Sequence, residues 1–308
     1  MSIRNSFEQQ ALIDSSNLGL DAVVAGLRVS REVTNKIRHR GDIRELPSRD
    51  ALAEVLQGLS AALFPTHYGR TDLNDETIDY FVGNTLSFTL HILAEQVRRG
   101  LLFVLEENTP EADVSRQAAE ITRRFAASLP DIRDVLASDI LAAFSGDPAA
   151  TSISEILLCY PGTTAIIYHR LAHALHRLGS PLLARLIADI AHSVTGIDIH
   201  PAAQIGGSFF IDHGTGVVIG ETTIIGERVR LYQAVTLGAK RFPTDEDGSL
   251  IKGNERHPIV EDDVVIYAGA TVLGRVTIGK GSTIGGNVWL TRSVAAGSNV
   301  SQAQMRND

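Results

Sequence analysis

Side chains that could do acid–base chemistry gather in the last third of the chain, in three short segments. The segments are IDIHP (197–201), IDHGTG (211–216) and NERHP (254–258). A histidine next to a carboxylate can act as a general base, because the carboxylate accepts one ring proton and leaves the other nitrogen free. An Arg–His pair is suited to binding an anion. The candidate residues are Asp198, His200, Asp212, His213, Arg256 and His257.

The elements that carry these residues follow a six-residue repeat. An aliphatic residue stands at every sixth position from Val260 to Leu290, followed four residues later by a small or β-branched one. The same register runs from Ile219 to Leu237, and an earlier one from Ile199 to Val217 ends in a two-residue phase shift. Such repeats are typical of parallel β-helices, in which each short strand points one aliphatic side chain inward. The repeat predicts a left-handed parallel β-helix over residues 197–308, with the polar segment 240–258 as an excursion loop.

In such a β-helix, Asp198 and His213 would lie one coil apart. They are separated by fifteen residues, close to the roughly 18 of a three-strand coil. A carboxylate at that place can orient the imidazole, so His213 is predicted to be a base and Asp198 its partner. For His200, which precedes a proline, a structural role is favoured. Arg256 and His257 are interpreted as an anion clamp, with a solvated loop as the alternative.

The preceding 196 residues predict an all-α helical domain, which makes the chain α + β in class. Hydrophobic residues recur at helical spacing after the capping residue Ser48. A second helix is predicted to end at Gly100, behind two arginines, and the last one at Gly196. The first 45 residues are interpreted as a mobile arm.

Composition limits the partners. Of 308 residues, 44% are hydrophobic and 21% charged, and the formal net charge of −8 argues against nucleic acid or an anionic membrane. The single cysteine, Cys159, cannot form a disulfide framework, and we expect it to be buried. The N-terminus lacks a signal-peptide pattern, and no apolar run could span a bilayer, so a cytoplasmic protein is predicted.

Three further histidines follow one another at helical spacing. His169, His173 and His176 stand at i, i+4 and i+7 of a predicted helix. This spacing suits a metal site, but no acid or cysteine completes the ligand set. We therefore expect no metal.

Longer motifs resemble a known family. DIHPAAQIGGSFFIDHGTGVVIGE (198–221), VTLGA (235–239) and RHP (256–258) closely resemble serine acetyltransferases, the first enzymes of cysteine synthesis. SGDPAA (145–150) resembles the Asp-Pro-Ala motif of that family. The resemblance implies direct transfer of acetyl from acetyl-CoA to the hydroxyl of L-serine, giving O-acetyl-L-serine and CoA.

The resemblance also implies roles for single residues. His213 matches the general base and Asp198 its orienting partner. The other matches are Asp147 and Asp212 for the serine ammonium group, Arg256 for the serine carboxylate, and His257 as a second substrate-binding group. Small residues that let the pantetheine arm lie close to the backbone match Gly238, Ala239, Ala268 and Gly286.

In this family acetyl-CoA lies between neighbouring β-helices, which implies a homotrimer. Helical domains commonly pair trimers into hexamers, but the helical part here is longer than usual, so the hexamer stays open. L-Cysteine is implied as a feedback inhibitor in the serine site. Ala239 replaces the second glycine of the usual motif. Many relatives end in an isoleucine that docks into O-acetylserine sulfhydrylase, and Asp308 does not fit such a pocket.

Three alternatives remain. The same fold could acetylate another hydroxyl acceptor, such as homoserine or a sugar. It could be a zinc enzyme resembling the γ-class carbonic anhydrases, with His200, His213 and His257 as ligands. It could also be a scaffold without catalysis, which would leave the Asp, His and Arg residues unexplained.

Overall fold

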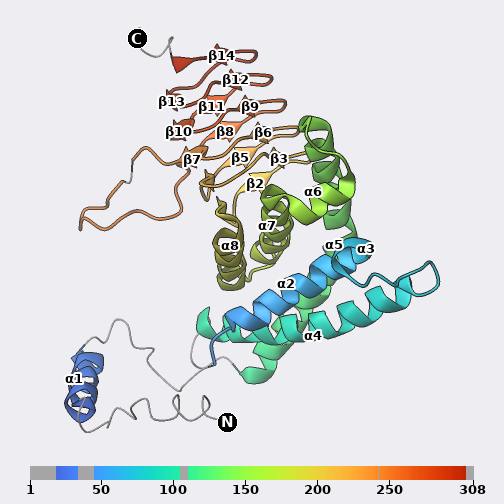
Figure 1. Ribbon diagram of the computed structural model, residues 1–308. Helices are drawn as coiled ribbons and strands as arrows, with labels where there is room; N and C mark the ends of the chain where they lie inside the picture. Colours follow the sequence, from blue (N-terminus) through green and yellow to red (C-terminus); the bar gives the residue numbers. More distant parts are fainter. Residues whose placement is uncertain (1–18, 34–44, 105–109, 242, 303–308) are drawn as a thin grey trace, which may run out of the picture. The chain divides into compact units, whose positions relative to one another are not determined.

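The computed structural model describes residues 19–33, 45–104, 110–241 and 243–302, and the chain divides into two compact units. The first unit, residues 1–45, contains helix α1 (Leu20–Val33). The rest of the predicted mobile arm lies almost entirely outside the described residues. The second unit, residues 46–308, carries the other helices and the strands (Figure 1).

The second unit begins with seven described helices. Ser48 caps the first of them as predicted, since its hydroxyl accepts a hydrogen bond from the amide of Ala51 at 3.2 Å. Gly196 ends the last one in the left-handed conformation, with φ of 70°. The helices are α2 (Arg49–Leu63), α3 (Pro65–Tyr68), α4 (Ile78–Val104), α5 (Glu111–Gly146), α6 (Ile153–Cys159), α7 (Pro161–Arg177) and α8 (Pro181–Thr195).

The predicted helix end at Gly100 is wrong, because α4 continues to Val104. Arg98 and Arg99 do not act as a C-terminal signal there; both guanidinium groups bind Glu95 one turn earlier. Gly100 is instead a packing residue. A Cβ at this position would lie 2.5 Å from Cδ1 of Leu183, so the glycine lets α4 approach α8 closely.

Short strands follow the helices and form three parallel sheets, which is the predicted parallel β-helix. The sheets have the orders β1-β4-β7-β10-β13, β11-β8-β5-β2 and β14-β12-β9-β6-β3. The strands are β1 (Asp198–Ile199), β2 (Gln204–Ile205), β3 (Phe210–Ile211), β4 (Val218–Ile219), β5 (Ile224–Ile225), β6 (Arg230–Leu231), β7 (Thr236–Gly238), β8 (Ile259–Val260), β9 (Val265–Ile266), β10 (Thr271–Leu273), β11 (Thr277–Ile278), β12 (Thr283–Ile284), β13 (Trp289–Leu290) and β14 (Asn299–Val300).

The repeat positions fill the interior of the β-helix. Leu231, Leu237, Ile266, Val272, Ile278, Ile284 and Leu290 are fully buried, and each is in register with a repeat position of a neighbouring coil. Stacked aliphatic side chains of this kind supply the hydrophobic stabilisation of the coils.

Between β1 and β13 the six-residue spacing is broken twice. Eight residues separate Ile211 from Ile219 instead of six, and this is the predicted phase shift. Twenty-three residues separate Leu237 from Val260, because the chain leaves the solenoid and returns. Both interruptions fall at turns between sheets, so the strands on either side stay in register.

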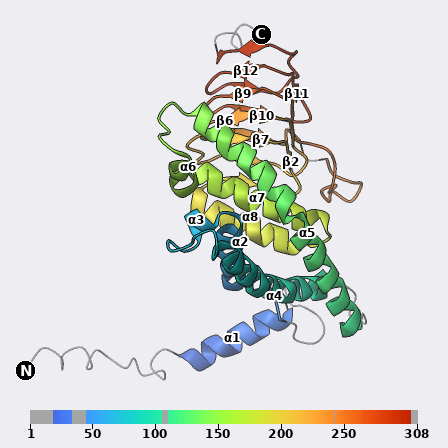
Figure 2. The same ribbon diagram turned by 90° about the vertical axis from the view of Figure 1, so that its right-hand side faces the viewer.

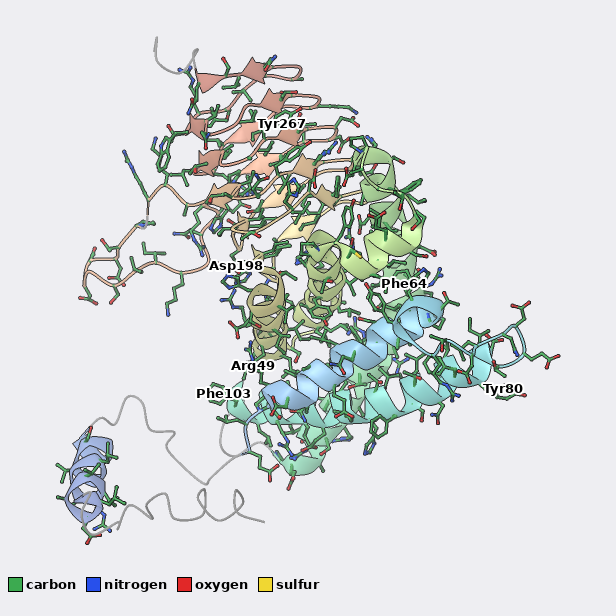
Figure 3. The ribbon with its side chains drawn as sticks, viewed as in Figure 1. Arg49, Phe64, Tyr80, Phe103, Asp198 and Tyr267 are labelled. Atoms are coloured by element: carbon green, nitrogen blue, oxygen red, sulfur yellow. The ribbon has the colours of Figure 1, made fainter. Side chains whose placement is uncertain are left out.

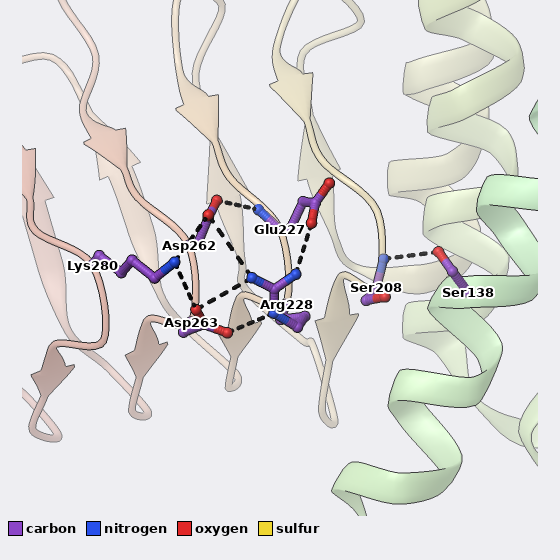
Figure 4. Close-up of polar contacts among 7 residues, drawn as sticks. All are labelled: Ser138, Ser208, Glu227, Arg228, Asp262, Asp263 and Lys280. Atoms are coloured by element: carbon purple, nitrogen blue, oxygen red, sulfur yellow. Dashed lines mark hydrogen bonds and ion pairs between the residues drawn. The ribbon is translucent and has the colours of Figure 1, made fainter.

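The turn between the second and third sheets carries an ion-pair ladder. Ser208, Arg228 and Asp263 follow one another up this corner, with φ of 55°, 56° and 60°. Arg228 binds Glu227 and Asp263, and Lys280 continues the ladder on the next coil (Figure 4). Exposed pairs of this kind contribute little stability singly, so we treat the ladder as the solvated edge of the β-helix.

The first coil rests on the helices. α7 and α8 lie beneath it, with α2 and α4 beyond them (Figures 1 and 2). Arg170 joins the two parts, since it binds the buried Asp139 through two nitrogens and donates to the carbonyls of Ile205 and Gly206. The amide of Phe209 also donates to Asp139. These bonds fix the first coil, which carries the candidate site, on the helices.

Two other predictions have definite outcomes. Cys159 is exposed, so the expectation of a buried cysteine is wrong; it is the last residue of the short helix α6, whose inner side is occupied by Ile156 and Leu157. None of the described helices combines the length and apolarity that a bilayer crossing requires.

Candidate active site

His213 lies in the corner that contains the two extra residues. We call the turns between the third and first sheets (212–217, 232–235, 267–270 and 285–288) the His213 corner. In the first coil this turn is two residues longer than in the coils that follow. His213 adopts φ of 59°, and its side chain is 70% exposed. The longer turn therefore places the imidazole at the surface of the β-helix, where a base can reach a substrate.

Asp212, beside His213, is largely buried and is held by an arginine. Its side chain is 11% exposed, and its Oδ1 lies 3.8 Å from Nδ1 of His213. Oδ2 lies 3.3 Å from Nη2 of Arg230, which stands one coil further along. The guanidinium of Arg230 is fixed between two rings, 5.1 Å from the centroid of Phe210 and 4.8 Å from that of Tyr232.

Asp147 comes to the same corner from the helices. It ends α5, and its Oδ1 accepts the amide of Ala149 at 2.8 Å. Its Oδ2 accepts the hydroxyl of Tyr160, the residue just before α7. The Tyr160 hydroxyl first and the Ala149 amide second lower the pKa of Asp147, with weaker contributions from the charges of Arg230 and His213. The same hydrogen bond raises the pKa of Tyr160 to about 12.

Asp198 lies on β1, at the helical end of the solenoid (Figure 3). Its backbone pairs with Val218, just beyond the His213 corner. Within the described part of the chain its carboxylate makes no hydrogen bond or ion pair. The carboxylate oxygen that lies 3.8 Å from the His213 imidazole belongs to Asp212, so the orienting role of Asp198 stays a prediction.

His257 and Arg256 lie at a different corner. We call the turns between the first and second sheets (200–203, 220–223, 239–258 and 274–276) the loop corner. The long excursion ends there, and the amides of Arg256 and His257 both donate to Oγ1 of Thr222, at 3.0 and 3.1 Å. The Arg275 guanidinium donates to the carbonyls of Thr222 and His257. Thr222 and Arg275 thus fix the point where the loop rejoins the solenoid.

The protonation state of His257 follows from its contacts. Its Nδ1 accepts the amide of Thr222 at 3.1 Å, so the neutral ring carries its proton on Nε2. Burial first, and then the charge of Arg256, lowers the pKa of His257 to about 4. His257 is therefore a neutral hydrogen-bond donor at pH 7. Because its Nδ1 lone pair already accepts the Thr222 amide and its pKa is low, His257 suits substrate binding better than proton abstraction.

Arg256 is held by an acid that the sequence analysis did not single out. Its Nη2 lies 2.6 Å from Oε2 of Glu221, and its Nη1 donates to the carbonyl of Asn254. His200 belongs to the same corner. Burial lowers its pKa to about 4, and its Nδ1 accepts the amide of Ala202, which fits the structural role predicted for it.

The predicted acetyl-CoA positions divide between the same two corners. Gly238 and Ala239 stand where the excursion leaves β7. Ala268 and Gly286 lie on successive coils of the His213 corner, and a Cβ on Gly286 would come within 3.3 Å of the Ala268 carbonyl oxygen. Each corner of one chain thus carries half of the predicted residues.

No three His, Cys, Asp or Glu side chains of the described residues gather as a metal site would require. The rings of His169 and His173 lie 5.7 Å apart, tilted by 33°, and Nδ1 of His173 binds the Pro201 carbonyl. The proposed zinc ligands divide between the two corners, with His213 on one and His200 and His257 on the other.

Among the residues of these networks that sequence reasoning missed are Arg230, Tyr160 and Glu221. Arg230 becomes visible only when the register is known, since the two-residue insertion places it opposite Phe210. Tyr160 lies behind a helix start with no chemical motif around it. Glu221 ends one of the quoted motifs, but its partner is 35 residues away.

Comparison with known proteins gives a consistent result. Two family models match: "Serine acetyltransferase, N-terminal" over residues 87–167 and "Bacterial transferase hexapeptide (six repeats)" over 257–292. A plasmid-borne serine acetyltransferase of Synechococcus elongatus is 61% identical over 297 residues, which cover 94% of this chain and 92% of that protein.

Solved structures agree. Serine acetyltransferase isoform 3 of Entamoeba histolytica, in complex with cysteine, is 34% identical, with a TM-score of 0.68 over 89% of each chain. Soybean serine acetyltransferase complexed with serine is 29% identical, with a TM-score of 0.52 over 82% of this chain and 96% of that one. With 61% identity along nearly its whole length to one such enzyme, the chain belongs to the serine acetyltransferase family.

Proposed function

We propose that this chain transfers the acetyl group of acetyl-CoA to the hydroxyl of L-serine. One observation carries the proposal beyond family membership. The solenoid departs from its six-residue register twice, and the two departures carry the acid–histidine pair and the Arg–His pair. An insertion that adds nothing to the stacked core is a place where a solenoid presents functional groups.

His213 acts as the general base. As the serine oxygen attacks the thioester carbon, the exposed imidazole takes its proton, because a neutral hydroxyl is a weak nucleophile. The tetrahedral oxyanion collapses, the carbon–sulfur bond breaks, and the proton passes to the leaving CoA sulfur. Asp198, one strand away, orients the imidazole and balances its charge while it is protonated.

Asp147 and Asp212 hold the serine ammonium group beside the base. Arg256 binds the serine carboxylate, and the Nε2–H of His257 adds a neutral donor to it. Glu221 keeps the Arg256 guanidinium in place. The ammonium and the carboxylate of one serine molecule can bind these groups at the same time only if the His213 corner and the loop corner lie next to each other.

The two corners are brought together by assembly. Within one chain, His213 and Arg256 lie at different corners of the three-sided β-helix. A shared site therefore requires that the loop corner of one protomer face the His213 corner of the next. We propose a homotrimer, in which each of three such interfaces also holds acetyl-CoA along Ala268 and Gly286 of one protomer and Gly238 and Ala239 of the other. L-Cysteine, which shares the ammonium and carboxylate of serine, competes for the same clamps.

The test is CoA release from acetyl-CoA, followed with a thiol reagent, with L-serine, L-homoserine or no acceptor. We expect release with serine only, and a loss of about 10²–10⁴-fold in His213→Ala. Release with homoserine at an equal rate would favour the broader acceptor class. Stoichiometric zinc in active protein, lost together with activity on chelation, would favour the zinc enzyme.

Direct transfer has its own test, because Cys159 is exposed and precedes Tyr160, which binds Asp147. No acyl-enzyme on this thiol is needed. Cys159→Ser is expected to keep full turnover and to show no burst of CoA in the absence of serine. A burst equal to the enzyme concentration that disappears in Cys159→Ser would replace direct transfer by a two-step route.

A further inference from the structure

The two carboxylates that receive the substrate ammonium already have a cation next to them. Arg230 lies against Asp212, with 3.3 Å between Nη2 and Oδ2, and its charge also acts on Asp147. Its Nη1 reaches the end of α5, where a Cβ on Gly146 would lie 3.6 Å away. No ion pair of Arg230 other than that with Asp212 occurs among the described residues.

This cation is fixed before any substrate arrives. The guanidinium is held between the rings of Phe210 and Tyr232, and the side chain is 24% exposed. Tyr232 is itself stacked on Tyr267 of the next coil, with 5.0 Å between ring centroids and an interplanar angle of 14°. Three coils of the His213 corner therefore contribute to holding one guanidinium. Its Nε is buried without a partner, so only the Nη atoms serve as donors to the site.

The charges of the proposed ammonium clamp and its arginine can be counted. Asp147 and Asp212 contribute two negative charges and Arg230 one positive charge, so the set carries one net negative charge. One ammonium group neutralises it. A neighbouring cation favours the charged form of a carboxylate, so removal of Arg230 would take this support from Asp212 and Asp147.

We propose that Arg230 is a positioning residue that sets the ammonium clamp to a single net negative charge and keeps both carboxylates ionised for serine binding. This inference rests on the proposed function. It adds a residue that the family motifs in this chain do not include, since Arg230 lies between the quoted motifs 198–221 and 235–239.

The neighbourhood contains other titratable groups that any test must separate. They come from every element packed at the corner: Asp147 at the end of α5, Glu155 on α6, Tyr160 before α7, Asp198 on β1, Asp212 and His213 after β3, Tyr232 after β6 and Tyr267 after β9. Tyr232 and Tyr160 do not titrate near neutral pH, because burial raises the pKa of Tyr232 and the hydrogen bond to Asp147 raises the pKa of Tyr160. His213 lies 3.8 Å from the Asp212 carboxylate, so it is removed from the measurement.

The experiment is calorimetric binding of L-serine between pH 5 and 8 to the oligomeric protein in a His213→Asn background. At low pH the binding constant for serine should fall, because a protonated carboxylate no longer binds the ammonium group. Adding Arg230→Met should raise the pH at which this acidic limb begins by about one unit, because one carboxylate must now lose its proton before the ammonium binds. Arg230→Lys should restore most of the original limb. Arg228→Met is the matched control, since it removes the same charge two residues away, at the ion-pair ladder.

The outcomes separate the inference from the proposed function. A uniform loss of affinity at every pH in Arg230→Met, or an unmoved limb, would mean that Arg230 only packs the corner, and the inference would be overturned. An equal shift in Arg228→Met would show a general charge effect and would overturn it as well. If His213→Asn and the native protein both fail to bind serine at any pH, and the native protein releases no CoA, the proposed function itself fails.

Discussion

The imidazole of His257 lies directly over the α-carbon of Gly220. A Cβ on Gly220 would stand 2.0 Å from Cδ2 and 2.2 Å from Nε2 of that ring. Since these atoms belong to a ring held by Thr222, the ring cannot move without losing its hydrogen bonds. The absence of a side chain at residue 220 therefore sets the position of a proposed substrate-binding donor one coil away.

Gly220→Ala should displace His257 and lower kcat/KM for serine by about 10–100-fold, mainly through KM, because a lost donor to the substrate costs on the order of 1.5–3 kcal/mol. Steady-state kinetics measure this. In a His257→Ala background the same glycine substitution should cost little, since the clash is gone. Independent, additive losses would show that Gly220 acts by another route.

Sharing of sites between protomers can be tested by mixing inactive variants. His213→Ala lacks the base and His257→Ala lacks the donor, so both homo-oligomers should turn over far more slowly than the native protein at a low serine concentration. After co-expression, interfaces that combine the intact His257 of one variant with the intact His213 of the other should regain up to about a third of native turnover. Purification through two different tags isolates the mixed oligomers. If they stay as inactive as the parents, both residues serve the same chain's site.

Two histidines of the loop corner, His200 and His257, predict a loss of stability in mild acid. Burial lowers the pKa of His200 and His257 to about 4, whereas unfolded histidine has a pKa near 6.5. Above pH 6.5 both states bind no proton and the stability is unaffected. As the pH falls from 6.5 towards 4, only the unfolded state takes up protons, so stability decreases.

By pH 5 each histidine should lower the free energy of unfolding by on the order of 2 kcal/mol. Urea unfolding at pH 7.5 and 5, at one protein concentration, measures the difference. His200→Gln should retain more of its pH 7.5 stability at pH 5 than the native chain does. An identical pH dependence in the two proteins would show that His200 is protonated in the folded state.

Gly100 and Gly83 offer a matched pair within one helix. A Cβ on Gly100 would meet Cδ1 of Leu183 at 2.5 Å, whereas nothing lies within 4 Å of that position on Gly83. Gly100→Ala should therefore destabilise the protein by about 1–3 kcal/mol through overpacking. Gly83→Ala should stabilise it by up to about 1 kcal/mol, because alanine is the better helix former. Thermal unfolding decides; equal shifts in both variants would exclude close packing at Gly100.

The regular parts of this molecule could be predicted from its sequence. A period of six is a direct consequence of stacked three-strand coils, so the strands and the phase shift before Ile219 were readable from aliphatic positions alone. The end of α4 could not be predicted in this way. A glycine after two arginines gives the same sequence pattern whether it ends a helix or allows a neighbouring helix to pack closely. Only the position of Leu183 distinguishes the two cases.

The candidate site was readable where motifs are contiguous and hidden where partners come from other coils. Asp212 and His213 are adjacent in sequence, so their pairing was visible. Arg230 reaches Asp212 across 18 residues, and this distance depends on a register that contains an insertion. The sequence did not show that His213 and Arg256 occupy different corners. This follows only from knowing which sheets each interruption of the repeat connects.

The two interruptions of the repeat have a consequence for how such proteins can change. Residues added at a corner leave the stacked aliphatic core and its hydrogen-bonded ladders untouched, so they are nearly free of the usual conflict between stability and new chemistry. One corner loop of the solenoid can therefore be replaced without changing the register of the coils or the position of the other loop. Segment 239–257 and the two extra residues around His213 are the natural places for grafting a different acceptor specificity onto this chain.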